Sequence, residues 1–164
     1  MMQQAIKLTQ ENDDELVARI AARDHGAMRL ASDRYTNMVW RVAYRMLGDA
    51  AEAEDIAQES LLKLWNHADR WNAGGPGIAP WLKKVTVNQC LDRLRRKRFA
   101  SDEEVPERED ETPLADRQME AVETGQAVKD CIETLPDRQR AAVILTYYEE
   151  QPNQGAAETL DMQL

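Results

Sequence analysis

The side chains that ordinarily catalyse reactions or bind metals are few and isolated in this sequence. Cys90 and Cys131 lie far apart and lack CxxC or CxxxH spacing, which argues against a zinc site and a disulfide framework. His25 and His67 have no partner at metal-ligand or catalytic-triad spacing. We interpret the cysteines as small core residues and the histidines as a turn residue and a helix-end residue. No metal and no cofactor is expected.

The same reasoning disfavours an enzyme. The sequence lacks a glycine-rich phosphate loop after a strand, a metal-ligand cluster and a nucleophile beside a base, which are the features that would indicate catalysis. Neighbouring acids such as Glu54 and Asp55 are better explained by solvation or by a protein-binding surface. Of the interpretations considered for this sequence, a helical enzyme is therefore the weakest, and we expect no catalytic residues.

The chemistry that the sequence does offer is electrostatic. The formal net charge is −9, yet residues 83–98 contain seven basic residues and one acid, a local charge of +6 that leaves −15 for the rest. Such a chain can bind DNA at one segment and repel it elsewhere. We therefore predict a DNA contact that depends on a partner protein. The basic residues are Lys83, Lys84, Arg93, Arg95, Arg96, Lys97 and Arg98.

A second polar surface is predicted on the helix that begins near Glu52. Side chains spaced by three and four residues share one face of a helix, and here that face is an exposed ridge that ends near Trp65. The pattern alone allows either a protein-binding surface or the solvated face of an ordinary amphipathic helix. The ridge residues are Asp55, Gln58, Glu59 and Leu62.

Helices must position both surfaces, because helical periodicity runs through almost every segment. We expect an all-α protein. Asn12, with Glu15 three residues later, is typical of a helix start. The next helix should stop at Gly48, and Asp49 can cap the helix that carries the ridge. In that helix the inward residues should be Ala53, Ile56, Ala57, Leu61 and Leu64.

The basic residues belong to a later helix. Residues 71–77 combine helix breakers with no apolar period, which predicts a loop, and Pro80 suits the first turn of a helix reaching about Arg98. An amide, an aspartate and several arginines on one face make this helix a credible DNA-reading element. That face has Lys84, Asn88, Asp92 and Arg96, with Arg93 and Arg95 beside it, and the core side has Leu82, Val87, Cys90, Leu91 and Leu94.

The composition also predicts two small helical domains. Acids and prolines dominate from about residue 100 to residue 113, and such a segment cannot bury enough apolar surface to order itself. We expect domains at 1–99 and 114–164, joined by a flexible acidic linker at 100–113. In the second domain, Pro136 should start a helix that ends at Gln151, before a last short helix at 154–160. The inward residues expected there are Ala121, Val122, Gly125, Val128, Ile132, Leu135, Ala141, Ile144, Leu145 and Tyr148.

No apolar run approaches the ~20 residues needed to cross a bilayer, and the first ten residues lack the apolar core of a secretory signal. We therefore expect a cytoplasmic protein without membrane insertion.

The motifs, taken in this order, resemble an extracytoplasmic-function (ECF) RNA polymerase sigma factor of the sigma-70 family over nearly the whole chain. Similar to conserved regions 2.1 and 2.2 are Tyr44-Arg45-Met46-Leu47-Gly48-Asp49, Glu52-Ala53-Glu54-Asp55-Ile56-Ala57-Gln58-Glu59 and Leu64-Trp65. Similar to regions 2.3 and 2.4 are Trp81-Leu82, Asn88-Gln89-Cys90-Leu91-Asp92 and Arg93-Leu94-Arg95-Arg96. Similar to the opening of region 4 is Leu135-Pro136-Asp137-Arg138-Gln139-Arg140.

The resemblance implies a role for each surface. Residues 1–99 would be region 2, whose ridge Asp55, Gln58, Glu59, Leu62 and Trp65 would bind the clamp helices of the large subunit of core RNA polymerase. The family melts the −10 element of promoter DNA, and residues 71–80 would form the pocket for a base that leaves the stack. Trp71 and Trp81 are equally well explained as core anchors. The implied DNA-binding residues are Trp71, Trp81, Lys84, Asn88, Asp92, Arg93, Arg95, Arg96, Lys97 and Arg98.

The resemblance also implies partners, and the sequence differs from the family pattern in one place. Such a protein would be a monomer when free, and an anti-sigma factor would hold it inactive. Residues 114–164 would be region 4 without most of its recognition helix, because the sequence stops at Leu164 where that helix should begin. We expect poor recognition of the −35 element. The alternative function is a truncated sigma-like decoy that binds polymerase or the anti-sigma factor without initiating transcription.

Overall fold

The protein is all-α, as expected. The structure, a computed structural model, describes residues 2–101 and 124–161, with side chains from 12 to 101 and from 125 to 161. Every regular element in these ranges is helical. In chain order they are α1 (Met2–Ala21), α2 (His25–Leu47), α3 (Ala50–His67), the short η1 (Ala68–Arg70), α4 (Ile78–Ala100), α6 (Thr124–Glu133), α7 (Asp137–Val143), the π-helical η2 (Ile144–Tyr148) and α8 (Asn153–Leu160).

The contacts divide the chain into two units, Met1–Cys90 and Leu91–Leu164, so the division falls within α4. Most of the predicted linker 100–113, together with Ala121 and Val122, lies outside the described residues. The predicted domain limits therefore stay a prediction. No helix in the described part of the chain is long and apolar enough to span a membrane.

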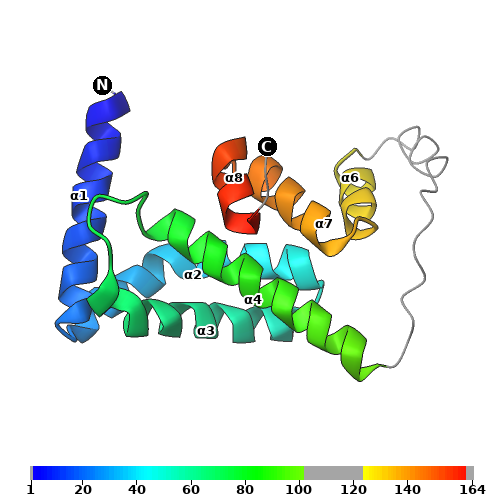
Figure 1. Ribbon diagram of the computed structural model, residues 1–164, viewed down its shortest axis with the longest axis horizontal. Coiled ribbons are helices and arrows are strands. Elements are labelled where there is room, and N and C mark those ends of the chain that lie inside the picture. The colour runs from blue at the N-terminus through cyan, green and yellow to red at the C-terminus, as the bar shows by residue number, and fades with distance from the viewer. Residues whose placement is uncertain (1, 102–123, 162–164) are drawn as a thin grey trace. The chain divides into compact units, whose positions relative to one another are not determined.

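The first unit is built on the pairing of α2 with α3, which lie side by side in Figure 1, with α1 across their ends. The core residues predicted for α3 are all buried, and so are Leu82, Val87 and Cys90 of α4, whereas Leu91 and Leu94 are only partly buried. Each fully buried aliphatic side chain stabilises the fold by roughly 1.5 to 3 kcal/mol. The central cluster contains Leu16, Val17, Ile20, Ala27, Ala31, Val39, Ala57, Leu61, Leu64, Ala68, Ile78 and Leu82.

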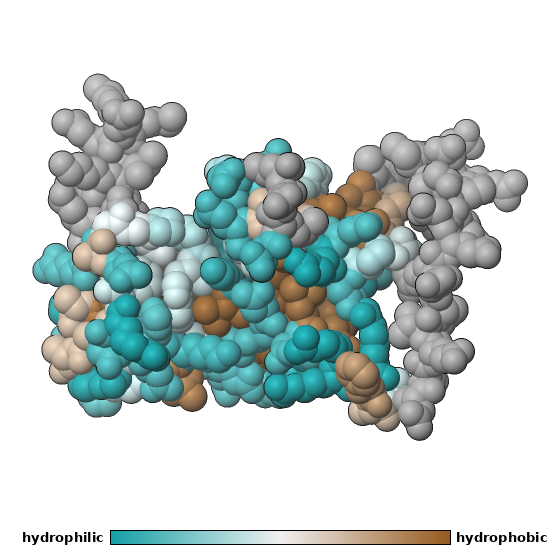
Figure 2. All heavy atoms as spheres, viewed as in Figure 1, coloured by the Kyte–Doolittle hydropathy of each residue, from teal (hydrophilic) through white to brown (hydrophobic). Residues whose placement is uncertain are grey.

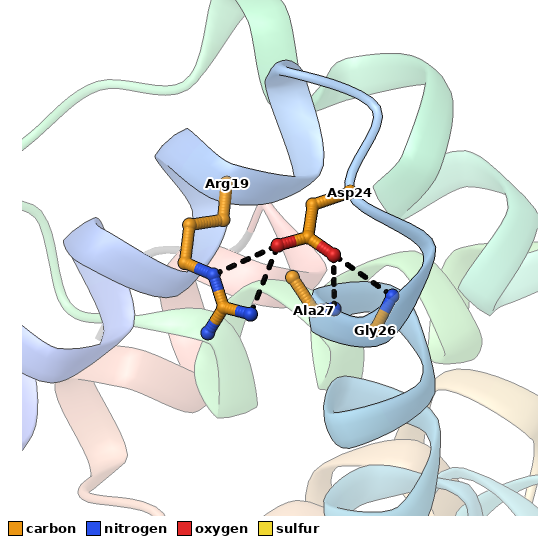
Figure 3. Close-up of polar contacts among 4 residues, drawn as sticks. All are labelled: Arg19, Asp24, Gly26 and Ala27. Carbon is orange, nitrogen blue, oxygen red and sulfur yellow. Dashed lines mark hydrogen bonds and ion pairs between the residues drawn. The ribbon is translucent and has the colours of Figure 1, made fainter.

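The corner between α1 and α2 is fixed by Asp24 (Figure 3). Asp24 Oδ1 accepts hydrogen bonds from the backbone N–H groups of Gly26 and Ala27, at 2.9 and 3.2 Å, and so caps α2. Its other oxygen accepts from Arg19 Nε and Nη2, at 3.1 and 2.9 Å. His25 is therefore the first residue of a helix, and its prediction as a turn residue was wrong.

Two predicted boundaries are confirmed and one is wrong. Gly48 ends α2 with φ +69°, and Asp49 Oδ1 caps α3 by accepting from the Glu52 N–H at 3.0 Å. By contrast, α1 does not start at Asn12 but at Met2. The preceding residues include alanine, leucine, lysine and glutamines, which favour helix, so the cap-like pair lies inside a longer helix.

The second unit has a small core of its own, made by Ile132, Ala141, Ile144, Leu145, Ala156 and Leu160. Tyr148 and Val128, predicted to face inward, are partly buried, and Gly125 is exposed. Arg140 donates to the backbone oxygens of Leu135 and Glu133, at 3.1 and 3.3 Å, and so closes the turn before α7. The short final helix is confirmed, but the preceding helical segment ends at Tyr148, before the predicted break at 151–153, and α8 begins at Asn153, inside it.

Candidate functional site

The polar ridge predicted on α3 is exposed along its length. Asp55, Gln58 and Glu59 are all exposed, and Leu62 has 57% of its surface exposed. The opposite face of α3 is buried in the core. The helix therefore presents an acidic and amide-rich strip with an apolar residue within it.

Trp65, at the end of the ridge, is partly buried because it packs against the α1–α2 corner. Its ring stacks on His25, with ring centres 5.4 Å apart, and the guanidinium of Arg23 lies 4.8 Å from the ring centre. Arg23 Nη1 also donates to the Trp65 backbone oxygen at 2.9 Å. Trp65 thus joins the ridge to the corner that Asp24 fixes.

The predicted DNA-binding face of α4 is largely exposed, and hydrophilic residues cover most of the α4 surface seen in Figure 2. Asp92 lies among the arginines and pairs with two of them, Arg95 and Arg96, the latter at 3.2 Å. The carboxylate orients both guanidiniums along the helix and lowers the local positive charge. Exposed residues of this face are Lys84, Asn88, Arg95, Arg96, Lys97 and Arg98, and Asp92 and Arg93 are partly exposed.

Trp71 and Trp81 belong to an aromatic cluster completed by His67. His67 stacks on Trp81 with 5.1 Å between ring centres, and Trp71 meets Trp81 edge to face at 5.9 Å. Both tryptophans are partly buried against the core. His67 is the last residue of α3, as predicted, but its aromatic partners were not anticipated. Whether either tryptophan stacks on a base stays a prediction.

The loop before α4 is attached to α1 by two acids that the sequence interpretation missed. Asp14 accepts from Trp71 Nε1 at 3.1 Å and from the Gly74 N–H at 3.0 Å. Asp13 accepts from the Ile78 N–H and from the Tyr35 hydroxyl, both at 3.1 Å. In Figure 1 this loop runs alongside α1.

One signal in the sequence could have identified Asp13. It precedes Leu16, Val17 and Ile20 by three, four and seven residues, so it falls on the apolar stripe of its helix. An acid in that stripe must be buried, and Asp13 is only 6% exposed. Because buried carboxylates need hydrogen-bond donors, its position indicates that donors come from another segment.

The hydrogen bond between Tyr35 and Asp13 has an electrostatic consequence. Burial and the nearby Asp13 carboxylate raise the pKa of the Tyr35 phenol to about 12. At the α1–α2 corner, the hydrogen bond from Arg19, followed by that from the Ala27 N–H, lowers the pKa of Asp24 below its ordinary value of 3.8. The phenol thus stays a donor and the cap stays charged over the physiological range.

Polar side chains also connect α3 to α4. The buried hydroxyls of Ser60 and Thr86 lie 3.3 Å apart, and Gln89 Nε2 donates to Ser60 Oγ at 2.8 Å. Thr86 also donates to the Leu82 backbone oxygen at 2.7 Å. This junction fixes the rotation of the first half of α4 against α3.

A helical protein with an acidic ridge on one helix and a cationic face on another has surfaces suited to binding both a protein and a nucleic acid. Comparison with known families agrees: the model for Sigma-70 region 2 matches residues 32–100, and that for Sigma-70, region 4 matches residues 125–163.

Individual relatives identify the subgroup. The ECF RNA polymerase sigma factor SigL of Mycobacterium tuberculosis is 31% identical over 136 residues, which cover 80% of this chain and 75% of SigL. The ECF sigma factor SigW of Bacillus subtilis is 27% identical over 161 residues, covering 92% of this chain and 80% of SigW. SigM of Mycobacterium tuberculosis is 34% identical over 137 residues, covering 82% of this chain and 66% of SigM.

The chain belongs to the ECF RNA polymerase sigma factors. It is accordingly an alternative sigma factor that directs transcription initiation by binding core RNA polymerase and promoter DNA. The sigma-70 family supplies promoter specificity and leaves RNA synthesis to the polymerase.

Proposed function

We propose that this sigma factor docks on the clamp helices of the large polymerase subunit through the α3 ridge and opens the −10 element with the 71–77 loop and α4. The observation that best supports docking is the exposure of Leu62 among acids and amides on a helix whose other face is buried. An apolar residue inside a polar rim is typical of a protein interface. The ridge acids would pair with basic clamp side chains and so set orientation and association rate.

Promoter opening follows from binding the opened form of DNA. Unstacking costs a few kcal/mol per base, and contacts that engage only single strands offset that cost. The 71–77 loop would receive the displaced base, and Asn88 would contact the base or its strand. Arg93, Arg95, Arg96, Lys97 and Arg98 would hold phosphates, a contribution that does not depend on sequence and falls with added salt.

Control by an anti-sigma factor is the second part of the proposal. The free protein would be a cytoplasmic monomer, and the inhibitor would cover the polymerase-binding surfaces of both regions. Support comes from membership of the ECF family and from the acidic, proline-containing sequence at 100–113, whose composition favours rearrangement between two domains.

Run-off transcription with purified core polymerase over a library of −10 sequences tests the assignments. Asp55→Ala should weaken polymerase binding, measured by fluorescence anisotropy, about three- to tenfold, as expected for loss of a charged interface pair. Arg96→Ala should leave polymerase binding intact and reduce transcription more at low salt than at high salt, because the lost phosphate contact makes the salt dependence shallower.

The controls are Asp33→Ala and Arg29→Ala, which remove the same charges from exposed positions of α2. Unchanged transcription in both test variants would remove the site assignments. A wild-type protein that binds core polymerase but yields no transcript on any promoter would instead be a decoy.

A further inference from the structure

We propose that Asp13 and Asp14 are positioning residues that hold the 71–77 loop in its base-receiving shape, so that α1 sets promoter specificity without touching DNA. This inference rests on the proposed role of the loop. It concerns residues outside the segment 32–100 that the region 2 model matches. It therefore extends the promoter-reading unit to α1.

Asp14 fixes the first half of the loop. Its two oxygens are divided between the Trp71 indole N–H, at 3.1 Å, and the Gly74 backbone N–H, at 3.0 Å. One carboxylate thus holds both the first residue of the loop and its middle. Because the charged acceptor makes each hydrogen bond stronger than a neutral one, the side chain of Trp71 is kept in one orientation between α1 and Trp81.

Asp13 fixes the end of the loop. Its Oδ2 accepts from the Ile78 N–H, where α4 begins, and its Oδ1 accepts from the Tyr35 hydroxyl on α2. Gly77 has φ +104°, and a Cβ atom there would lie 2.7 Å from Asp13 Oδ2. The glycine is therefore required twice, by its backbone conformation and by the carboxylate that occupies the place of a side chain.

What remains between these anchors is a short exposed tip that contains Asn72, Ala73 and Pro76. A tip whose two ends are held by hydrogen bonds loses less conformational freedom when it receives a base, and this preorganisation strengthens binding. It also restricts which base fits. Loosening either anchor should weaken discrimination between bases more than it weakens binding of the polymerase.

The test compares Asp14→Ala, Asp14→Asn and Gly77→Ala with the control Glu15→Ala, the exposed neighbour of Asp14 on α1. Run-off transcription over the −10 library gives the ratio of the preferred to the least preferred base at the most selective position. Loss of both Asp14 hydrogen bonds should reduce this ratio about fivefold or more. The ratio for Asp14→Asn, which keeps one acceptor oxygen, should lie between the ratios for Asp14→Ala and wild type.

Two further readouts distinguish positioning from general damage. Polymerase binding and the thermal melting of the helical signal should stay close to wild type for Asp14→Ala, because Asp14 is itself partly exposed and holds a loop outside the helices. Promoters with a mismatched, already open −10 element should restore transcription by Asp14→Ala while base discrimination stays low. A loss of transcription that is equal on all templates would overturn the proposal.

Asn72→Ala, at the loop tip, separates this inference from the function on which it depends. If Asn72→Ala changes base preference and the Asp14 variants do not, the anchoring role is wrong and the loop still reads the promoter. If neither changes base preference, the proposed role of the loop fails as well.

Discussion

The acidic residues of this chain differ in role because their neighbours differ. Asp24 is partly exposed and charged, and its partners are Arg19 and the first N–H groups of α2. Asp92 lies between two arginines on the predicted DNA face. Asp13 is buried and accepts from a phenol and a backbone N–H. Only the last arrangement requires residues from three different segments.

The raised pKa of Tyr35 gives a spectroscopic prediction. Since the pKa in the folded protein is about 12 and that of an ordinary tyrosine is near 10, the native state retains a proton that the unfolded state loses. The Tyr35 contribution to stability is therefore complete below about pH 10 and is lost as pH rises toward 12. In a titration of phenolate absorbance, Tyr35→Phe should remove the component that ionises last. Tyr147→Phe, which alters an exposed tyrosine, should leave the Tyr35 component in place.

Asp92 offers a prediction about charge. Asp92→Asn removes the carboxylate that Arg95 and Arg96 share, so affinity for non-specific single-stranded DNA should rise roughly two- to tenfold at low salt and fall more steeply as salt is added. Asp33→Asn makes the same charge change on α2 and serves as the control. Filter binding across a salt series measures both. Weaker non-specific binding by Asp92→Asn would show that the carboxylate itself contacts the nucleic acid.

Helices and their ends were largely predictable, because periodicity, glycine stops and side-chain caps are local signals. Gly48 and Asp49 define the α2–α3 turn as predicted. The start of α1 was not predicted correctly, since a cap-like pair is also compatible with a helix interior when good helix formers precede it. The ridge and the basic face were predicted for the same local reason.

Contacts between elements were much less predictable. Nothing local indicates that Asp14 meets Gly74 or that His67 stacks on Trp81, because these contacts depend on how helices cross. The two tryptophans were recognised as candidates, but their mutual packing required the fold. The position of Asp13 in an apolar stripe indicated that its carboxylate would be buried, but it did not indicate which groups would donate hydrogen bonds to it.

The Ser60–Thr86–Gln89 junction leads to a stability prediction for the α3–α4 pair. Thr86→Val removes a hydroxyl that lies against both Ser60 and the Leu82 oxygen. Thr36→Val is the matched control, because Thr36 also donates to a backbone oxygen one turn earlier, that of Ser32. Urea unfolding should show Thr86→Val to be less stable than Thr36→Val by about 1 kcal/mol. Equal losses in the free energy of unfolding would mean that the contact with Ser60 adds no stability.

The chain as a unit combines a net charge of −9 with a strongly basic segment at 83–98. The acidic remainder should repel DNA, so the free protein should bind duplex DNA weakly until polymerase supplies further contacts. This distribution, read from the sequence alone, agrees with the membership of a family that acts as part of a polymerase complex.

The proposed two-domain organisation predicts the outcome of cleavage. A protease site introduced between Ser101 and Thr112 should yield two pieces that each keep their helical signal, because each unit has its own buried core. Circular dichroism of the separated pieces measures this. Cooperative loss of all helical signal after the cut would contradict the two-domain organisation.

The anchoring of Gly77 and its loop on Asp13 and Asp14 has a practical consequence for anyone who wishes to exchange promoter preferences between relatives. A graft of residues 71–77 alone would place a foreign loop against acids that do not match it, and a grafted loop with a side chain at position 77 would collide with Asp13. An exchange of promoter preference must therefore transfer two segments that are separate in the sequence, the loop and the matching stretch of α1.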